Sequence, residues 1–181
     1  MKTAIVGVPI PAEVRSVLEK AQGGLHTGQF VAGKNLHVSI AAFEDQPDWM
    51  IDKLITSLAQ VEVGPFYIEV EGLGTEGGQT PTSLYAEIAD PKQLNKLHRQ
   101  VTRIARVDGV EIPHQKWAPG ITLATFGELG PHDMKQILSF CSRRAGLTAG
   151  PFPATEFVLW EVREEDGQTV HDPIQTYRLR M

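Results

Sequence analysis

The sequence predicts an α+β fold of two lobes, each a small sheet with two helices, whose sheets face each other across a cleft. The chain has 181 residues, the length of one domain or of two small, closely packed lobes. Short alternating apolar runs, typical of strands, are interspersed with apolar residues at helical spacing. Three sequence blocks recur in the same order roughly 80 to 86 residues apart, a period too long and too rarely repeated for a solenoid.

The recurring blocks define the two copies of the lobe. The first block is an alternating apolar run, a proline and a helical pattern; the second is a strand followed by a helical pattern; the third is Gly-Pro-Phe before a strand. The paired segments are Thr3–Gln22 with Thr82–Val101, His37–Glu44 with Gly120–Glu128, and Gly64–Phe66 with Gly150–Phe152. We therefore expect a single domain over residues 1–181, with intertwined lobes and a repeat covering approximately 1–74 and 81–162.

In the first copy, a strand over 5–8 precedes a helix whose first turn contains Pro11, where the missing N–H of proline costs nothing. The helix ends at Gly23–Gly24, and strands over 37–44 and 67–71 flank a second helix. The two helices are predicted from apolar faces at helical spacing, made of Val14, Val17, Leu18 and Ala21 in the first and Ile51, Leu54, Ile55 and Leu58 in the second.

In the second copy, a strand over 84–88 precedes a helix that opens at Asp90–Pro91. A strand at Gly120–Leu123 is followed by another helix, then by strands over 155–162 and 177–180. The apolar faces of these helices are Leu94, Leu97, Val101 and Ile104, and Met134, Ile137, Leu138 and Cys141. The segments 75–81 and 164–167 are predicted to be exposed loops or turns.

Composition excludes several classes of protein. Hydrophobic residues make up 41% and charged residues 22% of the chain, which is typical of a folded globular protein and not of a disordered one. No apolar run approaches the length of a membrane span, and no secretory signal is recognisable, so we expect a cytoplasmic protein with no membrane partner. The single cysteine, Cys141, excludes an internal disulfide framework. The net charge of −5 argues against coating long nucleic acid, although a local phosphate site is compatible with it.

The strongest candidate site is the segment Asn35–Ile40. In a strand, Val38 and Ile40 would face the core, whereas His37 and Ser39 would share the other face. A histidine beside a hydroxyl offers an acid–base group next to a donor that can hold a phosphate. The alternative interpretation is a strand with an ordinary polar outer face.

The matching segment of the second copy is Pro119–Leu123. By the same alternation, Gly120 and Thr122 face the cleft, so a two-fold arrangement would place the hydroxyls of Ser39 and Thr122 opposite each other. The chain has no histidine at position 120. Histidines at both 37 and 120 would make a symmetric acid–base pair, and the sequence has only the first of them.

Other histidines and basic residues are weaker candidates. His114 could loop back as a substitute base, although Pro113 and Pro119 argue against one continuous strand between it and position 120. We expect Lys34 at the rim of the cleft, and Arg178 and Arg180 on one face of the last strand, as phosphate-binding residues. The remaining histidines, His26, His98, His132 and His171, are interpreted as loop, helix-flank and turn residues, without the paired spacing of a metal site. Aromatic residues that could stack a base, but that are more often core, are Phe30, Phe43, Trp117 and Phe126.

These blocks together resemble the 2H phosphoesterase superfamily, specifically the bacterial 2′–5′ RNA ligase-like proteins, also described as RNA 2′,3′-cyclic phosphodiesterases. The resemblance covers nearly the whole chain and is carried by AIVGVPIPAEVRSVLEKAQ, FVAGKNLHVSIAAF, GPFYIEVEGLG, LYAEIADPKQLNKLHRQV, WAPGITLATF and YRLR. It implies a bilobal α+β fold with two antiparallel sheets on either side of a central cleft and helices outside. The family carries two His-x-Thr/Ser-x motifs, one on each lobe.

The resemblance also implies roles for three catalytic residues. His37 is the first catalytic histidine, expected to protonate the leaving 3′-oxygen, while Ser39 and Thr122 hold the phosphoryl oxygens. Gly120 replaces the second histidine, the expected activator of water, and Thr125 stands where an arginine often follows the second motif. A lost general base corresponds to about 10²–10⁴-fold in rate. Glycine is expected to leave an open space where the imidazole of the family stands, which water or a longer substrate could occupy. A histidine placed at position 120 is therefore expected to raise 2′,3′-cyclic phosphodiesterase activity.

The sequence therefore predicts hydrolysis of 2′,3′-cyclic phosphate or 2′–5′ linked ends of RNA or nucleotides, impaired by the loss at Gly120. The substrate is an RNA end or a cyclic nucleotide in the cleft, and the mechanism implies no metal, no cofactor and no obligate protein partner. The alternative is a catalytically silent protein that binds nucleotides or RNA ends. A third possibility is an interaction module that has kept only the fold.

Overall fold

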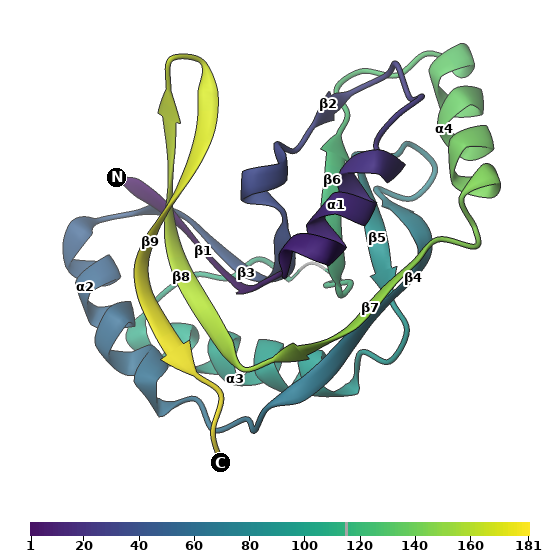
Figure 1. Cartoon of the computed structure of the whole chain (residues 1–181). Coiled ribbons are helices and arrows are strands. Elements are labelled where there is room, and N and C mark those ends of the chain that lie inside the picture. Colours follow the sequence, from purple (N-terminus) through teal and green to yellow (C-terminus); the bar gives the residue numbers. More distant parts are fainter. Residues whose placement is uncertain (115) are drawn as a thin grey trace.

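The structure of the chain is a computed structural model that describes residues 1–114 and 116–181. Its strands form two antiparallel sheets, which Figure 1 shows as the two arms of a curved molecule. The sheet called sheet A here has the order β3 (His37–Gln46), β1 (Lys2–Pro9), β8 (Glu156–Glu165), β9 (Gln168–Arg178). Sheet B has the order β2 (Gln29–Phe30), β6 (Gly120–Thr125), β5 (Ser83–Ile88), β4 (Phe66–Glu76), β7 (Thr148–Ala154). The α+β class with two antiparallel sheets is thus confirmed.

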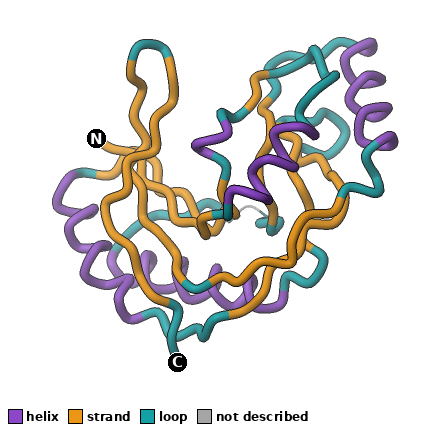
Figure 2. The backbone as a smooth tube through the Cα atoms, in the orientation of Figure 1, coloured by secondary structure: helices purple, strands orange, loops and turns teal. Residues whose placement is uncertain are grey.

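Over the described residues, four α-helices complete the molecule. Figure 2 draws the helices in purple. They are α1 (Ala12–Ala21), α2 (Asp48–Ser57), α3 (Lys92–Asp108) and α4 (Pro131–Arg143), with short 3₁₀ turns η1 (Gly33–Asn35) and η2 (Leu58–Gln60). The apolar faces predicted for α1, α2 and α3 are largely buried; α3, for example, buries Leu94, Leu97 and Val101. The face predicted for α4 is only partly right, because Ile137 is buried whereas Leu138 is 62% exposed and Phe140 is buried instead. None of the helices in the described chain is long and apolar enough to cross a membrane.

The two halves of the chain exchange helices. The first helix, α1, follows β1 of sheet A but packs against β7 of sheet B. Conversely, α3 follows β5 of sheet B but packs against β3 of sheet A, beside α2. The two strands that carry the site motifs, β3 and β6, contact each other where the sheets meet. This arrangement brings residues about 80 positions apart in sequence to one place.

The strands near the C-terminus are longer than the sequence predicts. The second Gly-Pro-Phe block lies inside β7, and β9 extends over Gln168–Arg178, where the sequence predicts a strand only at 177–180. Both strands contain prolines, which are compatible with β7 and β9 because these are edge strands, whose outer N–H groups need no partner. Of the predicted turn at 164–167, Asp166 and Gly167 form the tip of the β8–β9 hairpin, whereas Glu164 and Glu165 belong to β8 and pair with β9.

Candidate functional site

The inner faces of the two sheets line a cleft of about 930 Å³. The alternation predicted for β3 is observed, because Val38 and Ile40 are fully buried while His37 and Ser39 are half-buried and line the cleft. Gly120 and Thr122 of β6 line the same cleft. The structure therefore brings together the four positions of the two sequence motifs.

His37 is held in one orientation. Its Nδ1 donates a hydrogen bond of 2.8 Å to the carbonyl oxygen of Asn35, so in the neutral ring Nε2 carries the free lone pair. Burial lowers the pKa of His37 from 6.5 to about 4; the hydrogen bond to Asn35 opposes this decrease, and the nearby ring of His171 adds to it. Without a bound anion, His37 is therefore neutral at pH 7 and can accept a proton at Nε2.

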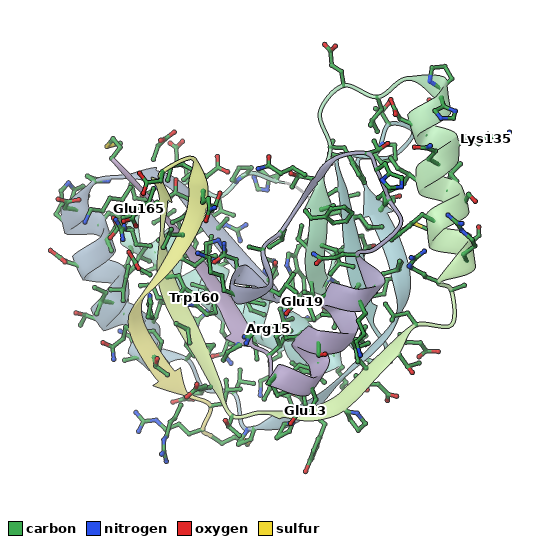
Figure 3. All side chains as sticks on the ribbon, turned by 45° about the horizontal axis from the view of Figure 1, so that its top comes forward. Glu13, Arg15, Glu19, Lys135, Trp160 and Glu165 are labelled. Atoms are coloured by element: carbon green, nitrogen blue, oxygen red, sulfur yellow. The ribbon has the colours of Figure 1, made fainter. Side chains whose placement is uncertain are left out.

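A glycine in β1 makes room for this ring. A Cβ atom at Gly7 would lie 2.5 Å from Cδ2 of His37, 2.7 Å from the carbonyl oxygen of Val38 and 3.1 Å from Cζ3 of Trp160. The imidazole therefore extends over β1 toward β8, where its centroid is 5.2 Å from that of Trp160. Figure 3 labels Trp160 on the β8–β9 side of the molecule.

A second histidine lies beside His37 on β9. The centroids of His37 and His171 are 5.5 Å apart, with the rings edge to face at 71°. His171 lines the cleft, and burial lowers its pKa below the usual range. The interpretation of His171 as a turn residue is wrong: it pairs with Val162 within the β8–β9 ladder.

One residue, Asn35, connects the segments that carry these two histidines. Its backbone carbonyl accepts the bond from His37, and its side-chain Nδ2 donates 2.8 Å to the carbonyl oxygen of Thr169 on β9. Asn35 is only 6% exposed, so this bond is shielded from water. It fixes β9, two residues before His171, against the turn that precedes His37.

The expected open space at position 120 is not present. A Cβ atom at Gly120 would lie 2.5 Å from Cδ2 of Tyr85 and 2.8 Å from the carbonyl oxygen of Ala86. The same ring also covers Gly74, whose Cβ would lie 2.9 Å from the tyrosine hydroxyl. The ring of Tyr85 therefore lies over Gly74 and Gly120 on the face of sheet B that lines the cleft. A histidine at position 120 would first have to displace this ring.

The hydroxyl and cationic groups of the cleft are accessible. Among the described residues, neither Ser39 nor Thr122 uses its hydroxyl in a hydrogen bond to the protein. Lys34 and Lys116 are exposed and line the cleft, as do three carboxylates, Glu44, Glu76 and Glu111. The two lysines do not outnumber the three carboxylates, so anion binding in this cleft would depend on single hydrogen-bond donors such as the hydroxyls of Ser39 and Thr122.

A third histidine, His98 of α3, also lines the cleft. Its Nδ1 donates 2.7 Å to the carbonyl oxygen of Ile40, and its ring stacks on Trp117 at 4.1 Å with an interplanar angle of 2°. Trp117, a candidate for stacking a base, therefore already has a partner on one face. Phe43, another such candidate, is buried in the core.

Several candidates from the sequence lie elsewhere. His114, Arg178 and Arg180 are not among the described residues that line the cleft, and His114 and Arg178 are exposed. Arg180 lies where the chain bridges to Val63, past the end of β9. His26 is exposed, and His132 lines a separate pocket of about 270 Å³ beside α4, the helix that carries Lys135 in Figure 3.

Sequence reasoning missed His171, Tyr85 and Lys116. The sequence predicts the last strand only over 177–180, which assigns His171 to a turn, although Pro173 is compatible with an edge strand that includes both residues. The position of Tyr85 depends on the register of β5 against β6, in which Tyr85 pairs with Thr122, and no local pattern encodes that register.

Comparison with known proteins gives a consistent result. Residues 8–166 match the family model described as the 2′-5′ RNA ligase superfamily. No curated protein matches the chain. Among solved structures, E. coli LigT complexed with 3′-AMP is 18% identical, with 99% of each chain covered and a TM-score of 0.79. TT0787 of Thermus thermophilus is 21% identical, with 98% of each chain covered and a TM-score of 0.73. Usb1 of Kluyveromyces marxianus is 12% identical, with 96% of this chain and 98% of that chain covered and a TM-score of 0.53. At these identities the structural likeness concerns the fold.

Proposed function

The chain belongs to the 2′-5′ RNA ligase superfamily, and on that premise we propose that it hydrolyses 2′,3′-cyclic phosphate, or 2′–5′ linked, ends of RNA or nucleotides in the cleft between its sheets. The family supports a function of the phosphoesterase type. The finer assignment is supported by the crystallisation of E. coli LigT with 3′-AMP, ATP and NADP⁺.

The observation that carries the proposal is a histidine with a fixed tautomer in a cleft that also contains two free hydroxyls. His37 keeps Nδ1 on the Asn35 carbonyl, so its Nε2 is the atom that meets a substrate. Ser39 comes from sheet A and Thr122 from sheet B, so a phosphate between them is held from two sides. Lys34 and Lys116 add positive charge at the same cleft.

The roles in hydrolysis of a cyclic phosphate follow from these donors. Ser39 and Thr122 donate hydrogen bonds to the non-bridging oxygens, which carry the growing negative charge. A bound phosphate anion raises the pKa of the neighbouring imidazole, so His37 takes up a proton in the complex. It then gives this proton from Nε2 to the 3′-oxygen as the bond from phosphorus to that oxygen breaks.

Strand β6 supplies no base at position 120, because Gly120 has no side chain and Tyr85 fills the space in front of it. Burial and the nearby carboxylates Glu87 and Glu76 raise the pKa of Tyr85, so its phenol stays protonated and does not accept a proton at neutral pH. This filled position favours one second candidate function, a silent protein that binds nucleotides or RNA ends.

The two functions are separated by a turnover assay with 2′,3′-cyclic nucleotides, with and without a chelator. An enzyme should show turnover that persists in the chelator and that His37→Gln lowers by about 10²–10⁴-fold. Binding of the nucleotide without turnover would favour the silent protein. If the protein neither binds nor turns over the nucleotide, the result would favour an interaction module that has kept only the fold.

A further inference from the structure

A histidine pair lines the cleft on sheet A, and neither sequence motif contains its second member. The ring centroids of His37 and His171 are 5.5 Å apart, the rings meet edge to face, and both residues line the same cleft. Two histidines at such a distance can act on the entering and the leaving oxygen of the same phosphorus, one as base and one as acid. A lone histidine cannot do both in one step.

The two rings differ in their hydrogen bonds. His37 uses Nδ1 to bind the Asn35 carbonyl, whereas among the described residues the ring of His171 has no hydrogen-bond partner. Burial lowers the pKa of both rings, and the charge on either ring disfavours charge on the other. Protonation of both rings at once is therefore disfavoured, so one ring keeps a lone pair that can accept a proton.

The protein holds the second ring in place. Asn35 bonds to the Thr169 carbonyl, two residues before His171, and the tip of the hairpin is braced where Thr169 donates to Glu164. The next residue, Asp172, is held by Arg163 of β8. The carboxylate of Asp172, next to His171 in the sequence, is therefore paired with Arg163 and not with the His171 ring. The other titratable groups that line the cleft are Lys34, Glu44, Glu76, Tyr85, His98, Glu111 and Lys116.

We propose that His171 is the catalytic base that β6 lacks, and that it activates water for attack on the phosphorus while His37 protonates the leaving oxygen. This inference rests on the proposed function. The water oxygen forms a bond to phosphorus, and a water proton passes to a ring nitrogen of His171. The bond from phosphorus to the 3′-oxygen breaks, and that oxygen takes the Nε2 proton of His37. The products are a 2′-phosphate and a 3′-hydroxyl. Transfer of a proton from His171 to His37 through water then resets the site.

The test is chemical rescue of His171→Gly with 2′,3′-cyclic nucleotides as substrates. We expect kcat to fall by about 10²–10⁴-fold with little change in KM, and added imidazole to restore part of the rate. His171→Gln, which keeps the size of the side chain without its basicity, should be as slow and should lose one limb of the pH profile. His132→Ala, on the surface of α4, is the matched control and should keep the wild-type rate.

The outcomes separate this inference from the function on which it rests. If wild type and His37→Gln differ as expected but both His171 variants keep the wild-type rate, His171 is not the base and the proposed function stands. If His171→Gly is slow but imidazole has no effect and the limb of the pH profile remains in His171→Gln, the ring only supports the structure. If the wild type does not turn over any substrate, the proposed function fails and this assignment fails with it.

Discussion

At the scale of single residues, glycines determine where the rings of His37 and Tyr85 can lie. Gly7 allows His37 to extend across β1, and Gly74 and Gly120 allow Tyr85 to lie across sheet B. A side chain at any of these glycines would meet a ring within 3 Å. The absence of histidine at position 120 therefore coincides with a tyrosine that occupies the corresponding space.

The lowered pKa of His37 predicts a pH dependence of stability. In the unfolded chain its pKa is near 6.5 and in the folded protein about 4, so the unfolded state binds more protons between these values. The contribution is complete above pH 6.5 and is lost as pH falls toward 4, with a size of at most about 3 kcal/mol. Urea unfolding at pH 7 and pH 4.5 should show a smaller loss of stability in His37→Gln than in wild type. Equal losses would mean that the folded protein does not lower the pKa of His37.

At the scale of elements, the packing of β5 against β6 fixes what position 120 can hold. Gly120→Ala places a Cβ against the ring of Tyr85 and the backbone carbonyl of Ala86, at 2.5 and 2.8 Å. We expect it to lower the free energy of unfolding by about 1–3 kcal/mol, because the backbone atom cannot move aside as a flexible side chain can. The midpoint of urea unfolding measures this loss.

Gly127→Ala is the matched control for this prediction, since no heavy atom lies within 4 Å of the added Cβ. It should unfold at nearly the wild-type urea concentration. If Gly120→Ala is as stable as Gly127→Ala, Tyr85 does not occupy the space described. The same contacts lead us to expect that Gly120→His alone does not restore a two-histidine site.

At the level of elements, the sequence predicts only those site residues whose position follows from the alternation of side chains along a strand. Alternation along β3 and β6 was enough to place His37, Ser39, Gly120 and Thr122 on the faces that line the cleft. His171 is not found this way, because the sequence predicts the last strand only over 177–180 and the edge position of β9 emerges only from the sheet order. The ring of Tyr85 over Gly120 depends on cross-strand register, which arises from tertiary pairing.

At the scale of the whole molecule, the cleft belongs to both halves of the chain. Sheet A combines β1 and β3 with β8 and β9 from the other end of the sequence, and α1 and α3 cross to the opposite sheet. We propose that this exchange follows from a duplication of the lobe, as the block repeat predicts. One consequence is that the hydroxyls of Ser39 and Thr122, which lie on two different sheets, line one cleft.

This shared cleft predicts coupled effects of Ser39 and Thr122 on phosphate binding. Ser39→Ala and Thr122→Ala should each weaken the binding of a 3′-nucleotide by about 1–3 kcal/mol, since each removes a hydrogen bond to a charged group. The loss in the double variant should differ from the sum of the single losses, because both hydroxyls contact one phosphate. Calorimetric titration measures all four proteins. Unchanged affinity in either single variant would show that its hydroxyl does not contact the phosphate.

The central claim is that this cleft performs histidine-dependent hydrolysis of a cyclic phosphate. The most direct measurement is the rate at which the wild type opens a 2′,3′-cyclic nucleotide in the presence of a chelator, beside His37→Gln under the same conditions, with the product identified by phosphorus NMR. We predict a 2′-phosphate as the product, and a rate about 10²–10⁴-fold lower in the variant. Equal rates for the two proteins, or a wild type that binds the nucleotide and leaves it intact, would contradict the account.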